Sequence, residues 1–355
     1  MAVVSLFLES AGRRLAGELL LEALLLLACV GVSAAPLPSI AESVELSSEY
    51  RSGDRFMGIR LLGSVQLARD AGDGDRVGGL SGLAWDDDAG LLYAVTDLGR
   101  LYHLEPVFGG GRLVDVRLRS VFPLRGASGR PLRGSWADAE GMVLERAQDG
   151  SPRLLISFER RPRIVRYRPD GRFDGVEVLP SALEDVSAYE GPNQGLEALA
   201  SLPGIGLLTV SERPMAGDPD GAVTIHALDG RRWKLPLSDE PAASVTAVEA
   251  VGGDELLILE RSFVSLMVPL VIRLRTTRLP PQTGSESLAV TEAAVFDNGD
   301  GWFMDNFEGL AHHRGRRFFM VSDDNASWLQ RTLLTYFELI EPDRHEPLQN
   351  TIGED

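Results

Sequence analysis

The chain has 355 residues, of which 44% are hydrophobic and 25% are charged, and its formal net charge is −17. This composition is typical of a folded globular protein and excludes a disordered chain. So negative a chain repels nucleic-acid phosphates, which excludes nucleic acid as a partner. Clustered acids suit a hard cation such as Ca²⁺, although the charge alone is also explained by solubility.

The first 35 residues have the pattern of a secretory signal peptide. Arg13 and Arg14 precede an apolar stretch, and small residues follow it just before Pro36. The uninterrupted apolar run at 23–32 is too short to cross a bilayer. We therefore predict a periplasmic or secreted protein with no membrane span after processing.

Cys29 is the only cysteine of the chain, which excludes an internal disulfide. It ends the sequence Leu26-Leu27-Ala28-Cys29, which resembles the lipobox of bacterial lipoproteins. Two interpretations stay open: a lipid anchor at Cys29, or an ordinary apolar residue of the leader. The polar, irregular residues 36–58 are predicted to form a linker.

From residue 59 onward the chain repeats itself. Five similar segments are each followed by a short apolar run that ends in an acid, as expected of buried strands. Spacings of 59, 57, 52 and 59 residues separate the aligned positions Ser81, Glu140, Glu197, Glu249 and Glu308. The acids that end the second runs are Asp97, Glu159, Glu212, Glu260, Asp323 and Asp324.

Units of this length with three or four strands are typical of β-propeller blades, which cover one another's faces around an axis. The last unit ends near Leu339 with only three strands, and an apolar strand at 59–67 is available to complete it. We predict an all-β, monomeric propeller over residues 59–342. It has five blades, or six if one repeat has drifted, its N-terminal strand closes the ring, and residues 343–355 form a C-terminal tail.

In a propeller the first strand of each blade lines the central channel, so the repeated acids should meet at one end. Carboxylates gathered in this way must protonate, pair with arginine or bind a cation. The predicted ligands for Ca²⁺ are Asp97, Glu140, Glu197, Glu249, Glu308, Asp323 and Asn325. Alternatively, the repeated glutamates serve only the contacts between blades.

Arginine directly follows three of the acids that end the second runs, Glu159, Glu212 and Glu260. A guanidinium group can bind two phosphate oxygens at once. The predicted substrate-binding residues are Arg160, Arg213 and Arg261. The predicted catalytic acids are Asp97, Glu140, Glu159, Glu212, Asp323 and Asp324. Nucleophilic catalysis through Ser81 is disfavoured, because residues 79–82 lack the nucleophile-elbow pattern.

At these residues the chain resembles the family called "esterase-like activity of phytase". The resemblance runs from about residue 78 to residue 339, and its strongest segments are 193–199, 208–213, 255–263, 305–310 and 322–325. It implies an exported bacterial propeller, and the family name points to ester or phosphate-ester hydrolysis. The motifs of the calcium-dependent propeller phytases are absent.

Two hypotheses follow from the residues and the resemblance. The first is a metal-assisted ester or phosphomonoester hydrolase that acts on a small anionic or ester substrate at the mouth of the channel. The second is a non-catalytic binding propeller of the cell envelope, in which the acids are structural.

Overall fold

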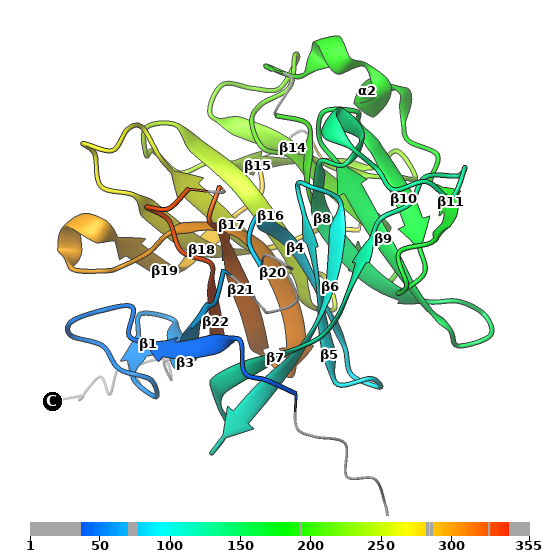
Figure 1. The fold of residues 1–355 in the computed structure, drawn as a ribbon. Coiled ribbons are helices and arrows are strands. Elements are labelled where there is room, and N and C mark those ends of the chain that lie inside the picture. Colours follow the sequence, from blue (N-terminus) through cyan, green and yellow to red (C-terminus); the bar gives the residue numbers. More distant parts are fainter. Residues whose placement is uncertain are drawn as a thin grey trace, which may run out of the picture. The chain divides into compact units, whose positions relative to one another are not determined.

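The computed structural model describes residues 37–69, 77–191, 194–281, 284, 287–325 and 327–340. The described strands lie in the compact unit that begins at Pro38 and form five antiparallel sheets. These sheets follow one another along the chain as the blades of a β-propeller (Figure 1). The predicted all-β propeller is therefore confirmed, with five blades.

Blades 1 to 4 each contain four consecutive strands. Blade 1 consists of β4 (Leu80–Asp86), β5 (Leu91–Thr96), β6 (Arg100–Gly109) and β7 (Arg112–Pro123). Blade 2 consists of β8 (Ala139–Arg146), β9 (Pro152–Phe158), β10 (Arg163–Tyr167) and β11 (Phe173–Val176). Blade 3 consists of β12 (Leu196–Leu202), β13 (Gly206–Ser211), β14 (Ala222–Ala227) and β15 (Arg232–Pro236). Blade 4 consists of β16 (Ala243–Gly252), β17 (Glu255–Ser262), β18 (Val271–Arg278) and β19 (Val290–Asp297).

Blade 5 joins the two ends of the propeller. It consists of β20 (Asn306–Arg314), β21 (Arg317–Asp323), β22 (Leu333–Leu339), β3 (Ile59–Leu67), β1 (Ala41–Val44) and β2 (Arg55–Phe56). The strand β3 pairs antiparallel with β22, with Leu339 opposite Ile59. The innermost strand β20 in turn contacts β4 of blade 1, so the ring closes as predicted.

Residues 38–58 differ from the linker expected there. The strand β1 pairs with β3, β2 forms a hairpin with β3, and Ile40 and Leu46 are buried. So short an edge strand leaves too weak a pattern of alternating apolar residues to be recognised in the sequence. This segment therefore extends blade 5 outward.

The hydrophobic core lies between successive blades, and the innermost strands pack there backbone against backbone. A Cβ atom at Gly82 would lie 2.1 Å from the carbonyl oxygen of Glu140, and one at Gly309 would lie 2.5 Å from that of Ser81. Only glycine permits so close an approach. The neighbouring residues Ser81, Glu140 and Glu308 are thereby held at fixed positions around the axis.

Helical structure is minor in the described residues. It comprises one short α-helix, α2 (Ser181–Glu184), and three 3₁₀ turns, Gly134–Trp136, Val186–Ala188 and Asn298–Asp300. Within this part of the chain, no helix has the length and apolar character needed to cross a membrane. The leader at 1–35 with Cys29 and the tail at 343–355 lie outside the described residues and stay predictions.

Candidate functional site

Each innermost strand has a β-bulge near its start, where the pairing skips one residue or, in β8, two residues. A bulge changes the direction in which the skipped side chain points. The skipped residues at equivalent positions are Ser81, Glu140, Glu197, Thr246 and Glu308. All of these except Thr246 line one cavity.

The register corrects the predicted position of Glu249. Thr246 occupies the equivalent place in blade 4, and Glu249 lies three residues further along β16, opposite Leu257. Glu249 does not line the cavity, and its carboxylate accepts a hydrogen bond of 2.8 Å from the backbone N–H of Ala250. Burial raises the pKa of Glu249 to about 7. The pair Glu249-Ala250 imitates Glu197-Ala198 in sequence, which explains the misalignment.

The ends of the second strands provide a matching set of five. In each second strand, one residue pairs with the residue that directly precedes the bulge. The next residue along the second strand is Asp97, Glu159, Glu212, Arg261 or Asp323 in blades 1 to 5. All five line the same cavity. Blade 4 thus carries an arginine where the other blades carry an acid. Its own acid, Glu260, is one position earlier and pairs with Arg275 at 2.8 Å, away from the cavity.

The cavity has a volume of about 680 Å³. Its lining contains eight carboxyl groups but only two guanidinium groups. The predicted site residues that line it are Asp97, Glu140, Glu159, Arg160, Glu197, Glu212, Arg261, Glu308, Asp323 and Asn325. Because the acids outnumber the arginines so strongly, the cavity needs protons or cations to balance its charge.

Two further predicted residues, Asp324 and Arg213, lie outside this lining. The buried carboxylate of Asp324 accepts a hydrogen bond of 3.1 Å from the N–H of Gly79 and lies 3.7 Å from Nε of Arg69. Arg213 donates to the carbonyl of Ala242 at 3.4 Å. Successive residues at the end of a strand point to opposite sides, so Asp323 faces the cavity and Asp324 does not.

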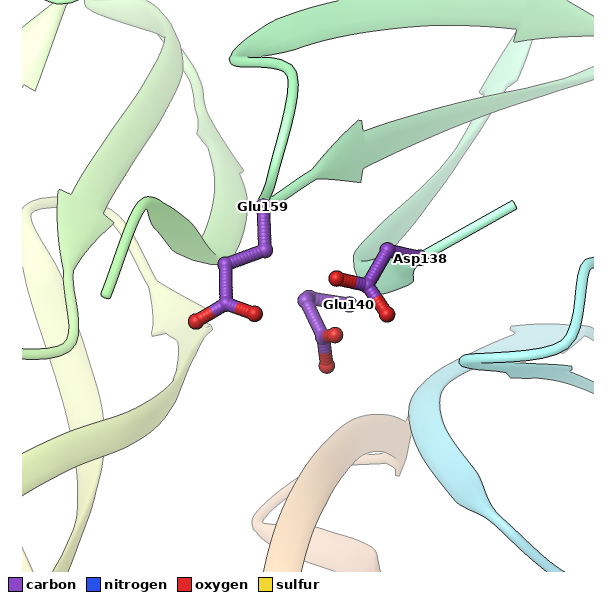
Figure 2. A group of neighbouring side chains, drawn as sticks. All are labelled: Asp138, Glu140 and Glu159. Atoms are coloured by element: carbon purple, nitrogen blue, oxygen red, sulfur yellow. The ribbon is translucent and has the colours of Figure 1, made fainter. Parts of the chain in front are cut away.

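Asp138, Glu140 and Glu159 form a first group of carboxylates (Figure 2). One oxygen of each lies within 4.8 Å of the others. Asp138 and Glu140 are two residues apart at the start of β8 and so share a face. The N–H of Glu159, just after β9, donates to the carbonyl of Asp138 at 3.1 Å, which holds the two strand ends together.

A second group consists of Glu159, Glu197 and Glu212, again with one oxygen of each within 4.8 Å of the others. Glu159 therefore belongs to both groups. Glu197 is only 6% exposed, and Glu140, Glu212, Glu159 and Glu308 place further negative charge around it. A buried carboxylate among other carboxylates is costly unless it is protonated or binds a cation.

Burial and mutual repulsion raise the pKa values of these acids. Loss of hydration raises the pKa of Glu140 and of Glu197 well above its usual range, and the neighbouring carboxylates raise it further. Burial, reinforced by Asp138 and Glu212, raises the pKa of Glu159 to about 8. Burial and Glu308 likewise raise the pKa of Asp323 to about 8. Without a cation, these groups therefore hold protons near neutral pH.

The opposite side of the cavity is neutralised by Arg261. Its Nη1 lies 2.7 Å from Glu308 and its Nη2 lies 2.9 Å from Glu212. Nη1 also donates to Asn306, whose amide donates to Glu308 at 2.6 Å. Although burial opposes the charge, these carboxylates raise the pKa of Arg261. Its hydrogen-bond donors are thus engaged with carboxylates and the amide of the cavity.

Arg160 is more open than Arg261. Its Nε lies 2.9 Å from a carboxylate oxygen of Asp138, and 44% of its side chain is exposed. It stands beside the first carboxylate group and stays partly open to solvent. Of the three predicted substrate-binding arginines, Arg160 therefore has the geometry best suited to that role.

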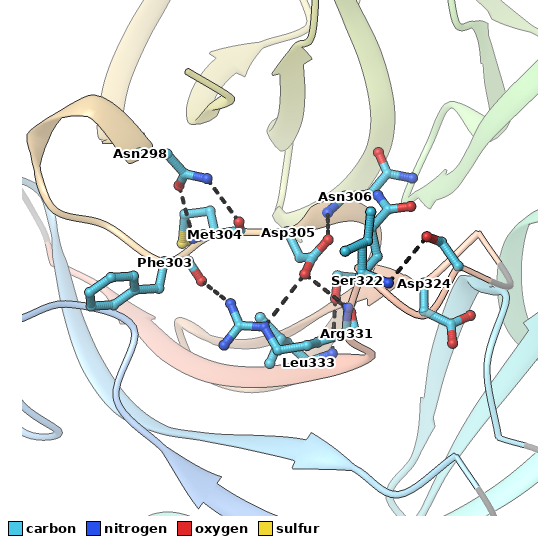
Figure 3. Close-up of polar contacts among 12 residues, drawn as sticks. Asn298, Phe303, Met304, Asp305, Asn306, Ser322, Asp324, Arg331 and Leu333 are labelled. Atoms are coloured by element: carbon cyan, nitrogen blue, oxygen red, sulfur yellow. Dashed lines mark hydrogen bonds and ion pairs between the residues drawn. The ribbon is translucent and has the colours of Figure 1, made fainter. Parts of the chain in front are cut away.

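Hydrogen bonds hold the segment that leads into β20 (Figure 3). The carboxylate of Asp305 accepts from the N–H of Asn306 at 3.2 Å and from that of Arg331 at 2.9 Å. The side chain of Asn298 bonds both the N–H and the carbonyl of Met304, at 2.9 and 3.0 Å. These contacts fix the position from which Asn306 and Glu308 reach the cavity.

Residues 75–326 match the family model described as Phytase-like, esterase-like activity of phytase. The chain belongs to this family. This confirms the family predicted from the sequence, and no match was found among curated proteins.

Solved structures similar to this phytase-like protein have low sequence identity to it. A gluconolactonase from Xanthomonas campestris is 13% identical with a TM-score of 0.37, over 85% of this chain and 99% of that one. The β-propeller domain of Swd1 from Myceliophteria thermophila has the same four values. A tail fibre of a Staphylococcus aureus phage is 10% identical with a TM-score of 0.41, over 83% of this chain and 55% of that one.

Among the residues at the start of the innermost strands, sequence reasoning missed Asp138 and Asn306, which line the phytase-like cavity. Each stands two residues before a repeated glutamate, Glu140 or Glu308. Residues two apart on an extended strand point to the same side, so the spacing itself was a usable signal. It went unused because the other blades carry Gly79, Gly195 and Ser244 at this position.

Proposed function

We propose that this chain is an exported, metal-assisted hydrolase of ester or phosphomonoester bonds, acting on a small substrate in the cavity. The observation that carries the proposal is the pair of carboxylate groups that share Glu159 and include the buried Glu197. The family description supports hydrolysis. Export rests on the predicted leader at 1–35.

The carboxylates fit a hard divalent cation, because every candidate ligand is an oxygen atom. Asp138, Glu140 and Glu159 would hold it in the first group, and Glu159, Glu197 and Glu212 in the second. A bound cation of this kind polarises a carbonyl or phosphoryl oxygen and lowers the pKa of water. We name Ca²⁺ as the ion to test first.

The remaining side chains have roles that follow from their positions. Arg160 orients an anionic substrate with its guanidinium group. Asp323, protonated because of its raised pKa, donates its proton to the oxygen of the leaving alcohol. Water adds to the acyl carbon or phosphorus, the bond to the alcohol oxygen breaks, and the proton lost by the water passes to a cavity carboxylate. No histidine of the described part lines the cavity, so the carboxyl groups carry the proton transfers.

The test is hydrolysis of p-nitrophenyl acetate and p-nitrophenyl phosphate by purified protein, first stripped with EDTA and then supplied with Ca²⁺, Mg²⁺ or Mn²⁺. We expect activity only with a cation. Glu159→Gln should lower kcat/KM by at least about 100-fold, because both carboxylate groups lose a member. Glu249→Gln is the matched control and should retain activity, since Glu249 lies outside the cavity. Wild-type protein that hydrolyses neither compound with any of the three ions would refute the proposal.

The engagement of Arg261 with Glu212 and Glu308 favours a second candidate function, a binding propeller of the cell envelope without catalysis. In that case the acids are structural, or hold a structural ion. A melting temperature raised by Ca²⁺ without any hydrolysis would support this function. Equal melting temperatures in EDTA and in Ca²⁺ would show that neither proposed function involves a bound Ca²⁺.

A further inference from the structure

The mouth of the cavity carries a group of exposed apolar side chains on two loops. One loop lies between β17 and β18 and contributes Phe263, Leu266 and Leu270 to the cavity lining. The other lies between β21 and β22 and contributes Leu329. Leu266 is 86% exposed and Leu329 is 62% exposed. Phe263, Leu266 and Leu329, together with Met267 and Trp328, which are 91% and 81% exposed, form what we call the apolar rim.

Hydrogen bonds hold the backbone under the apolar rim in place. The side chain of Arg69 donates to the carbonyls of Ser327 and Gln330, on either side of Trp328 and Leu329. The N–H of Ser327 also donates to the carbonyl of Asp324 at 2.7 Å. In the other loop, the N–H of Val268 donates to the carbonyl of Ser265 at 3.1 Å. The exposed side chains are therefore presented to solvent by an anchored backbone, as at a binding surface.

Phe263, Leu266 and Leu329 of the apolar rim line the same cavity as the carboxyl groups, which come from blades 1, 2, 3 and 5. A substrate with several phosphate groups would meet eight carboxyl groups and two arginines, and it would leave the apolar rim unused. A molecule with one polar reactive group and an apolar chain matches both surfaces.

We propose that the substrate is an amphiphilic ester, whose ester group lies at the carboxylates and whose acyl chain lies against Phe263, Leu266 and Leu329. This inference rests on the proposed hydrolase function and specifies its substrate class. In the reaction, water adds to the acyl carbon and the bond from that carbon to the alkoxy oxygen breaks. The products are a fatty acid and an alcohol that carries the proton given up by the enzyme.

The first experiment compares p-nitrophenyl acetate, butyrate and octanoate with the cation-loaded protein. We expect kcat/KM to rise at least about tenfold from acetate to octanoate, because each methylene buried against the rim adds to binding in the transition state. Leu266→Ser and Leu329→Ser should abolish the rise, with a loss of kcat/KM that grows from acetate to octanoate. Val178→Ser is the matched control, because Val178 is 85% exposed but does not line the cavity.

Failure of this inference differs from failure of the proposed function. A flat chain-length series, or an equal loss on all three esters in Leu266→Ser, overturns the amphiphilic substrate and leaves the hydrolase intact. If no ester is hydrolysed, the fluorescence of Trp328 still tests whether an acyl chain binds at the apolar rim. The Trp328→Phe variant identifies the contribution of Trp328 to the emission. Methyl octanoate should shift this emission to shorter wavelength and methyl acetate should not, and equal spectra would overturn the inference.

A final experiment tests whether the apolar rim binds a membrane surface instead of the acyl chain of a substrate. Phosphatidylcholine vesicles should not retain the wild-type protein in a flotation assay. Retention that is lost in Leu266→Ser, together with a flat ester series, would make the apolar rim a membrane contact and overturn the proposal.

Discussion

Blades 2 and 4 carry residues of opposite chemistry at equivalent positions of their innermost and second strands. Blade 2 supplies Glu140 and Glu159 at the two positions where blade 4 supplies Thr246 and Arg261. Around blade 2 the carboxylates crowd together, and their pKa values rise. Around blade 4 the single guanidinium group joins Glu212 of blade 3 to Glu308 of blade 5.

The contrast shows how one repeat supports two roles. In both blades the residue at the end of the second strand lines the cavity, Glu159 in blade 2 and Arg261 in blade 4. Which residue stands there decides whether that side of the ring is neutralised or left acidic. On the neutralised side Arg261 joins blades 3 and 5, and the acidic side carries the proposed chemistry.

Removing the guanidinium group of Arg261 should have the largest effect on the difference between blades 2 and 4. Arg261→Met leaves Glu212 and Glu308 without their buried partner, and such a loss costs about 3–5 kcal/mol in unfolding free energy. Urea unfolding at pH 8 in EDTA measures it. Arg261→Met combined with Glu308→Gln should recover part of the loss, and a single variant as stable as wild type would contradict the neutralising role.

The acidic side should make the cation-free protein less stable as pH rises. Burial raises the pKa of Glu159 from 4.5 and that of Asp323 from 3.8, each to about 8. Between these limits the folded state keeps protons that the unfolded state has released, so the unfolding free energy falls as pH rises through this window. We expect Tm in EDTA to fall by about 5 °C between pH 5 and pH 8.5.

Calcium should raise Tm more at pH 8.5 than at pH 5, because at pH 8.5 the carboxylates release fewer protons when they bind the ion. In EDTA, the Tm of the double variant Glu159→Gln, Asp323→Asn should depend less on pH than the Tm of the wild type. A wild-type Tm that does not change over this range would show that the acids of blades 2 and 5 are not protonated in the folded state.

A smaller effect would come from the open arginine of blade 2. Arg160→Gln should raise KM for p-nitrophenyl phosphate about tenfold with little change in kcat, since one charged contact to the substrate is lost. Hydrolysis of p-nitrophenyl acetate, which is uncharged, should stay the same. Arg161→Gln is the matched control, because Arg161 lies 4.4 Å from the ring of Trp136 and does not line the cavity. Equal changes in both substrates would assign Arg160 a structural role.

The smallest effect would test the sealing role of blade 4. The hydroxyl of Thr246 donates to the carbonyl of Phe307 at 3.0 Å, which joins blades 4 and 5. Thr246→Val should lower the unfolding free energy by about 1 kcal/mol and leave ester hydrolysis unchanged. A loss of activity at unchanged stability would place Thr246 in the reaction instead.

Much of the fold was predictable because the repeat is written in short, regular apolar runs. The five blades and the closing strand Ile59–Leu67 were found from these runs. Residues 38–58 were not, because an edge strand of four residues hardly constrains its side chains. The family was recognised from segments that lie at the bulges and strand ends.

The candidate site was predictable only in outline. Residue type and spacing place acids at one end of the ring, but a bulge shifts the register by one residue, and sequence alone does not reveal where it falls. Glu249 was aligned with Glu197 and Glu308, although Thr246 occupies that position in blade 4, and Glu260-Arg261 was taken for an equivalent of Glu159-Arg160. Whether Asp323 or Asp324 faces the cavity depends on the same register.

The pairing of β3 with β22 sets the order in which the molecule can assemble. These strands are far apart in the chain, and their ladder forms only when residue 333 and those after it are present. Until then blade 5 has an open edge, and the position of Asp323 depends on a sheet that is still incomplete. The final placement of Asp323 at the cavity and the circular closure should therefore appear together, as a late and slow event of folding.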